Sequence, residues 1–136
     1  MRSLEIILGL GNVEATEEQK NDWLNQKNED YLAYIDKMDD SEILPGVMRV
    51  LNFLKDHNQP IILGSASKNA RPILEKVNIL NYFDDIVDGN DVSNAKPDPE
   101  VFIVGARKAN QTNENSIVFE DSVAGIEAAN IAGMTS

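Results

Sequence analysis

From residue 41 onward, short apolar runs alternate with helical patterns. Three runs have the length and flanking residues of buried strands: PIILGS, DDIVDG and SIVFED. Helical patterns surround them in LPGVMRVLNFLKDHNQ, ARPILEKVNIL, KPDPEVFIVGARKAN and SVAGIEAANIAG. Parallel strands need long crossover connections, and these are usually helical. The alternation therefore predicts an α/β fold with a parallel sheet.

The first 40 residues carry only helical patterns. SLEIILGLGN has an apolar face and closes with glycine and asparagine, as the end of a helix does. Thr16 and Gln19 have the spacing of a capping box at the start of a second helix, which we expect to reach about Met38. We therefore expect a helical domain over residues 1–40 and an α/β domain over residues 41–136.

Composition excludes several classes of function. The chain has 23 acidic and 12 basic residues and a net charge of −11, which argues against binding of a nucleic acid backbone. It has no cysteine, so disulfides and thiolate chemistry are excluded, and this fits an intracellular, cytoplasmic protein. No apolar stretch approaches the roughly 20 residues of a membrane span. Any bound phosphate must be held locally, by backbone amides or by a cation.

Polar residues follow the first apolar run, at the kind of strand end where open parallel sheets bind their ligands. They are Ser65, Ala66, Ser67, Lys68 and Asn69. Backbone amides, hydroxyls and the start of a helix would form an anion site there. A strand-to-helix turn capped by serine explains the same residues equally well.

The other two runs are also followed by charged residues. Lys96 precedes Pro97, which favours an extended turn, although a Lys-Pro pair alone is more often a surface loop. Glu120 and Asp121 are adjacent carboxylates that repel each other unless a positive charge lies between them. Oxygen ligands of this kind suit Mg²⁺. The competing interpretation makes Asp121 a helix cap and Glu120 a solvated side chain.

In this order, a hydroxyl loop, a Lys-Pro pair and a Glu-Asp pair resemble the second, third and fourth motifs of the haloacid dehalogenase superfamily of phosphotransferases. SASKN, AKPDPEVF and VFEDSVAGIEAANIAGM look similar to its beta-phosphoglucomutase family. The resemblance covers nearly the whole chain. It implies a Rossmannoid core over residues 41–136 and part of a helical cap domain over residues 1–40. The implied activity is Mg²⁺-dependent isomerisation of beta-glucose 1-phosphate to glucose 6-phosphate through an aspartyl-phosphate.

The resemblance also implies a role for each motif residue. Ser65 and the backbone amide of Ala66 would bind the transferring phosphoryl group, and Lys96 would neutralise its charge. Glu120 and Asp121 would hold the Mg²⁺. A cation pair around one phosphate suits phosphoryl transfer, which needs mainly positioning and charge stabilisation. The second phosphate or the hydroxyls of the sugar would bind at Ser67, Lys68 and Asn69.

Two residues of the helical domain match cap positions that face the substrate, Lys27 and, more loosely, Ser3. Lys27 lies on the apolar stripe of the second helix, where snorkelling of its ammonium to water is the ordinary explanation. With the resemblance, both interpretations of Lys27 stay open. The implied partner is a small phosphosugar, with no nucleic acid and no membrane, and the complete protein is expected to be a monomer.

The family's nucleophile is an aspartate of a DxD motif at the end of the first core strand, and it has no counterpart in this sequence. In the family's sheet that strand lies centrally, between the strands that match PIILG and SIVF, so both would expose unpaired edges here. We therefore expect a fragment of a longer enzyme that has no turnover by itself. The alternatives are a phosphatase of the same superfamily acting on small sugar phosphates, or a non-catalytic remnant that binds phosphate, Mg²⁺ or a partner.

Overall fold

The computed structural model describes residues 2–136, with side chains from Leu4 onward. The chain forms two compact units, Met1–Met38 and Asp39–Ser136. The division falls near the boundary expected at residue 40. The assignment of the first unit to a cap domain stays a prediction.

The first unit contains two helices, α1 (Arg2–Gly11) and α2 (Glu17–Ile35). Asn12 follows α1 with a positive φ of 49°, a conformation that asparagine tolerates and that ends the helix. The capping box before α2 is present, because Thr16 Oγ1 accepts from the Gln19 amide at 3.2 Å while Gln19 Oε1 accepts from the Thr16 amide at 2.9 Å. Both expected helices are thus confirmed, although α2 ends at Ile35, before Met38.

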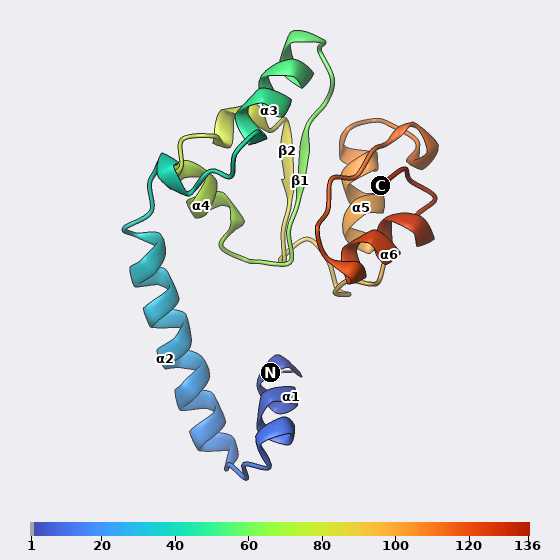
Figure 1. Cartoon of the computed structure of the whole chain (residues 1–136). Helices are drawn as coiled ribbons and strands as arrows, with labels where there is room; N and C mark the ends of the chain where they lie inside the picture. Colours follow the sequence, from blue (N-terminus) through green and yellow to red (C-terminus); the bar gives the residue numbers. More distant parts are fainter. Residues whose placement is uncertain (1) are drawn as a thin grey trace. The chain divides into compact units, whose positions relative to one another are not determined.

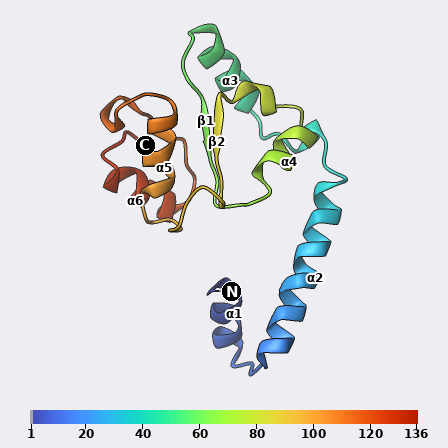
Figure 2. The ribbon, with the colours of Figure 1, turned by 180° about the vertical axis from the view of Figure 1, so that it is seen from behind.

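The second unit is built around a parallel pair of strands. Its elements are α3 (Val47–Asp56), β1 (Ile62–Gly64), α4 (Ala70–Lys76), β2 (Asp85–Val87), α5 (Glu100–Lys108) and α6 (Val123–Ile131), with short 3₁₀ turns at Asp40–Glu42, Leu80–Tyr82 and Asn113–Asn115. The two strands pair in parallel, with Leu63 opposite Ile86. Helices α3 and α4 lie on one side of the strands, and α5 and α6 lie on the other (Figures 1 and 2). This arrangement confirms the expected α/β fold.

Helix α5 packs directly on both strands. A Cβ atom at Gly105 would lie 3.4 Å from Ile62 Cγ2 and 4.0 Å from Val87 Cγ2, so the helix backbone approaches the strands closely. Val87 is fully buried beneath it. A second buried cluster joins α5 to the C-terminal residues through Ala106, Ala132 and Met134. The strands and α5 therefore form the frame on which the loops at the strand ends are held.

A proline lies close to the start of two helices. Pro45 precedes α3, which begins after Gly46, whose φ of 90° suits glycine. Pro99 is the residue directly before α5. The Asp98 side chain holds this helix start, because its Oδ1 accepts from the Glu100 amide at 3.0 Å.

The run SIVF was expected to form a third buried strand, and this expectation is wrong. Only one parallel bridge is present there, between Ile117 and Thr135. Ile117 is 68% exposed and Phe119 74% exposed. Among the described residues, no strand pairs along this run, and β1 is paired only to β2. An apolar run without neighbouring strands leaves its backbone and side chains open to water.

Replacing Phe119 with serine is expected to change the free energy of unfolding by no more than about 0.5 kcal/mol, because most of the ring is already in contact with water. Self-association should decrease, since an exposed apolar run favours edge-to-edge contacts. Urea unfolding and analytical ultracentrifugation would measure the two effects. A loss of about 2 kcal/mol or more would show that the ring is buried.

Candidate phosphate and metal site

The loop between β1 and α4 is held by its own hydroxyls. The Ser65 amide donates to the Val87 carbonyl at 2.8 Å and so continues the pairing of the strands. Ser65 Oγ accepts from the Ser67 amide at 3.1 Å, and Ser67 Oγ accepts from the Asn69 amide at 3.1 Å. The two serine hydroxyls therefore hold the turn, but no serine caps α4, whose N-cap residue is Asn69. Each hydroxyl keeps its own proton, which an anion can accept, so the anion interpretation is compatible with the same geometry.

The loop after β2 packs against the hydroxyl loop. A Cβ atom at Gly89 would lie 2.6 Å from the Ala66 carbonyl oxygen and 3.2 Å from Lys68 Cγ. Only glycine fits this approach of two backbones. Ala66 and Lys68 themselves are exposed, whereas Ser65, Ser67 and Asn69 are half-buried.

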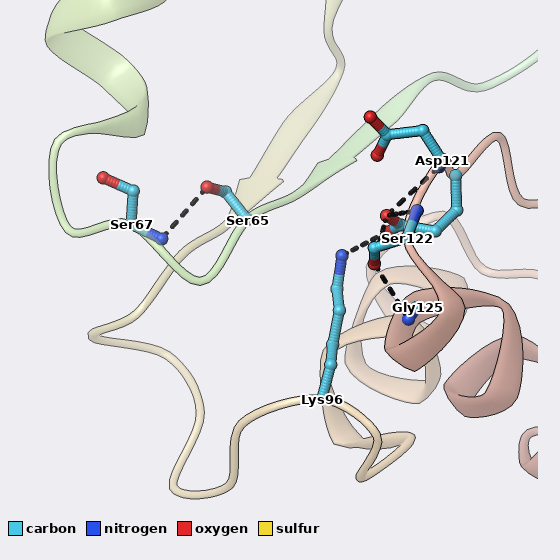
Figure 3. A network of polar contacts seen from close by, with 7 residues as sticks. Ser65, Ser67, Lys96, Asp121, Ser122 and Gly125 are labelled. Carbon is cyan, nitrogen blue, oxygen red and sulfur yellow. Dashed lines mark hydrogen bonds and ion pairs between the residues drawn. The ribbon is translucent and has the colours of Figure 1, made fainter. Parts of the chain in front are cut away.

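Lys96 points toward the end of the SIVF run. Its Nζ donates a hydrogen bond to Glu120 Oε2, and the two form an ion pair (Figure 3). The side chains are only 18% and 10% exposed, respectively. The ammonium also lies 4.9 Å from the centroid of the Phe102 ring, within the range of a cation–π contact. Lys96 is therefore not an ordinary surface-loop lysine, although 24 residues separate it from Glu120.

Glu120 is held by hydrogen bonds on both oxygens. Oε1 accepts from Ser122 Oγ at 2.8 Å and from the Ser122 amide at 3.1 Å, while Oε2 accepts from Lys96. Burial by itself raises the pKa of the Glu120 carboxyl, but the hydrogen bonds from Lys96 and Ser122 outweigh burial and lower this pKa to about 2. Glu120 is thus a fixed anion at neutral pH, and the interpretation as a solvated side chain is wrong.

The carboxylate of Asp121 is exposed and points away from the Lys96 ammonium (Figure 3). The interpretation of Asp121 as the cap of α6 is wrong, because Ser122 is the cap and its Oγ accepts from the Gly125 amide at 3.0 Å. Carboxylates of this kind suit Mg²⁺, which commonly takes one or two of them and fills the other positions with water or phosphate. No group of three acidic, histidine or cysteine side chains lies together within the described residues. The carboxylate oxygens of Glu120 and Asp121 are therefore of the type that Mg²⁺ prefers, and most of its other ligands would come from water, backbone or phosphate.

The expected site residues are brought together only in part. Lys96 and Glu120 are in contact, with Asp121 adjacent in the chain, but the Ser65 hydroxyl faces Ser67 (Figure 3). Lys27 belongs to α2 in the other unit, and its Nζ lies 5.9 Å from the centroid of the Tyr31 ring. The Ser3 side chain lies outside the part of the chain whose side chains the structure describes. The roles of Lys27 and Ser3 therefore stay predictions.

A family model described as haloacid dehalogenase-like hydrolase matches residues 2–133. The chain belongs to this haloacid dehalogenase-like family. Beta-phosphoglucomutase of Bacillus subtilis is 38% identical over 134 residues, which are 97% of this chain and 59% of that protein. A phosphorylated carbohydrates phosphatase of Thermotoga maritima is 37% identical over 99 residues, 69% of this chain and 46% of that protein.

A solved structure of a family member has the same fold. The crystal structure of beta-phosphoglucomutase from Clostridium difficile superimposes with a TM-score of 0.88 at 40% identity, covering 98% of this chain and 60% of that one. The chain thus spans no more than about 60% of the length of these three haloacid dehalogenase-like relatives. None of the helices in the described part of the chain is both long and apolar enough to cross a membrane.

Four residues near this haloacid dehalogenase-like site were not identified from the sequence: Gly89, Phe102, Ser122 and Gly125. Ser122 had a usable signal, because a serine directly before a helical pattern is a typical N-cap. Phe102 fitted an ordinary apolar stripe of α5. The two glycines had no local signal. Glycine is needed at Gly89 because the Ala66 carbonyl lies close to it, and at Gly125 because the Glu120 side chain does.

The low pKa of Glu120 predicts a pH-dependent contribution to stability. Because the folded-state pKa of about 2 lies below the usual 4.5, the ionised carboxylate stabilises the fold fully above about pH 4.5, and this contribution is lost as the pH falls toward 2. We expect the difference in unfolding free energy between the wild type and Glu120→Gln to be constant from pH 7 to 5 and to shrink below pH 4.5. Urea unfolding at stepped pH would measure it, and a difference that stays constant down to pH 3 would contradict the assignment.

Proposed function

We propose that this chain contributes the phosphate-binding and Mg²⁺-binding residues of a sugar-phosphate phosphotransferase of the beta-phosphoglucomutase type. The observation that carries the proposal is the half-buried Lys96 ammonium, fixed against Glu120 in the same unit as the SASKN loop. The similarity to the two beta-phosphoglucomutases, at 38% and 40% identity, supports the choice of reaction.

In this proposal the chain binds and neutralises a phosphoryl group. The Ser65 hydroxyl and the Ala66 amide donate hydrogen bonds to its oxygens, and the Lys96 ammonium balances its negative charge. Glu120 orients Lys96, and Glu120 and Asp121 would hold Mg²⁺, which when bound supplies further neutralisation of phosphoryl oxygens. Phosphoryl transfer depends mainly on such positioning and charge stabilisation.

The remaining loop residues are assigned to the far end of the substrate. Lys68 is exposed beside Gly89, and together with Ser67 and Asn69 it would bind the second phosphate or hydroxyls of the sugar. Lys27 and Ser3 are also assigned to substrate binding. In this proposal the complete protein is a cytoplasmic monomer, and the 136 residues alone show no turnover, because no residue here matches the nucleophile of the family.

A phosphatase acting on small sugar phosphates is the second candidate. The 37% identity to the phosphorylated carbohydrates phosphatase of Thermotoga maritima favours it. The two activities differ in whether a sugar hydroxyl or water accepts the phosphoryl group. With a complete protein that contains this chain, ³¹P NMR of beta-glucose 1-phosphate would decide between them. Formation of glucose 6-phosphate supports the mutase, and release of inorganic phosphate without isomerisation supports the phosphatase.

The proposed metal site can be tested on the chain itself by calorimetric titration with Mg²⁺. Asp121→Asn is expected to weaken Mg²⁺ binding at least about tenfold, because it removes a charged oxygen ligand. Glu127→Gln is the matched control, since it removes an exposed carboxylate from α6. The absence of Mg²⁺ binding to the wild type, or equal affinity of wild type and Asp121→Asn, would refute the site.

A further inference from the structure

Gly125 lies in the first turn of α6, where its backbone conformation gives no reason for glycine. The glycines with positive φ among the described residues are Gly46 and Gly133. A glycine within a helix costs about 1 kcal/mol relative to alanine. Gly125 is also buried, so exposure to solvent does not explain the missing side chain. Glycine at this position is therefore explained by a lack of room for a side chain, and not by a backbone conformation that only glycine adopts.

The space at Gly125 is filled by Glu120. The three heavy atoms nearest to a Cβ atom built on Gly125 are Glu120 Cδ, Cγ and Oε2, and all of them overlap it, well inside the 3.0 Å that real Cβ contacts keep. The Glu120 carboxylate therefore occupies the position that the side chain of any other residue would take.

The overlap involves the oxygen that Lys96 binds. Glu120 Oε2 accepts from Lys96, and Oε1 is held by Ser122. Ser122 Oγ in turn accepts from the Gly125 amide at 3.0 Å, so the carboxylate and the first turn of α6 are linked by hydrogen bonds as well as by contact. Figure 3 shows Lys96, Ser122 and Gly125 converging on this point.

We infer that Gly125 is a positioning residue: its lack of a side chain lets the Glu120 carboxylate lie against the first turn of α6, where it fixes the Lys96 ammonium. Gly125 contacts neither substrate nor metal in this inference and acts through Glu120. The effect of the Glu120 position on phosphate and Mg²⁺ binding rests on the proposed function. The dependence of that position on Gly125 does not.

Gly125→Ala tests the inference directly. We expect the variant to fold and to lose the scalar coupling across the hydrogen bond between Lys96 ¹⁵Nζ and Glu120 ¹³Cδ, measured by NMR at low temperature. Mg²⁺ affinity, measured by calorimetry, should fall about tenfold. Gly105→Ala is the matched control, because it places a methyl group at a buried glycine of α5, 3.4 Å from Ile62 Cγ2, and should keep the coupling. Persistence of the coupling in Gly125→Ala would overturn the inference.

A second experiment compares the urea midpoint of unfolding in two backgrounds, and it remains informative if Gly125→Ala folds only weakly. In the wild-type background, Gly125→Ala is expected to lower the urea midpoint of unfolding, because the methyl group displaces Glu120. In a Glu120→Ala background the same change is expected to raise the midpoint, because the overlap is gone and alanine favours the helix. An equal decrease in both backgrounds would overturn the inference. If the coupling depends on Gly125 but the wild type binds no Mg²⁺, the inference holds and the proposed function fails.

Discussion

Lys96→Met is expected to lower the unfolding free energy by about 3 kcal/mol, because it leaves the Glu120 carboxylate without its cation. Glu120 is only 10% exposed, so water replaces the lost partner poorly. Methionine keeps an unbranched side chain that still reaches the Phe102 ring, so the change removes mainly the charge. Under the proposed function, phosphate binding should be lost as well. Urea unfolding at pH 7 and titration with inorganic phosphate would measure the two effects.

Two further variants show whether the loss comes from an uncompensated charge. Lys55→Met breaks an ion pair of Nζ to Asp84 Oδ1 at 3.1 Å whose side chains are 36% and 49% exposed, and it should cost less than about 1 kcal/mol. Adding Glu120→Gln to Lys96→Met should recover part of the loss, because a neutral amide is less costly to bury. Equal losses from Lys96→Met and Lys55→Met would show that the Lys96 pair is an ordinary surface pair.

The alternation of runs and helical patterns correctly predicted the fold, because each helix and both strands carry their own local pattern. The run SIVF has the same local pattern as PIILG, yet it is not a strand. A strand needs a neighbour with free backbone groups, and among residues 2–136 the backbone of SIVF pairs in a strand-like way only with the segment around Thr135. Local pattern predicts that a segment can pair, whereas the neighbouring segment decides whether it does.

The site shows the same division between local and long-range information. The sequence placed Lys96 and Glu120 at the ends of apolar runs, and the topology of a parallel sheet predicted that such ends lie at one edge. It left the surface-loop and solvated interpretations open, because the contact that excludes them joins residues far apart in the chain. The sequence did not identify Gly125 either, because glycine is needed there to make room for the Glu120 side chain.

Gly89→Ala is expected to cost about 2 kcal/mol and to displace the hydroxyl loop. Its Cβ atom would lie 2.6 Å from the Ala66 carbonyl oxygen, and since this is a backbone atom, it cannot move aside as a flexible side chain does. Relief requires the loops after β1 and β2 to separate, which would disturb the hydrogen bonds of Ser65 and Ser67. Amide chemical shifts of residues 65–69 would report the displacement, and urea unfolding the cost.

Gly64→Ala is the matched control for this prediction, because it adds a methyl group one residue before the same loop. Its Cβ atom would lie 3.4 Å from Val101 Cγ2, an ordinary contact, and the cost should stay below about 1 kcal/mol. If phosphate binds the hydroxyl loop as proposed, Gly89→Ala should also weaken phosphate binding while Gly64→Ala leaves it unchanged. Unchanged amide shifts in Gly89→Ala would mean that the two loops are not in contact, and the positions assigned to Ser65 and Lys68 would then be wrong.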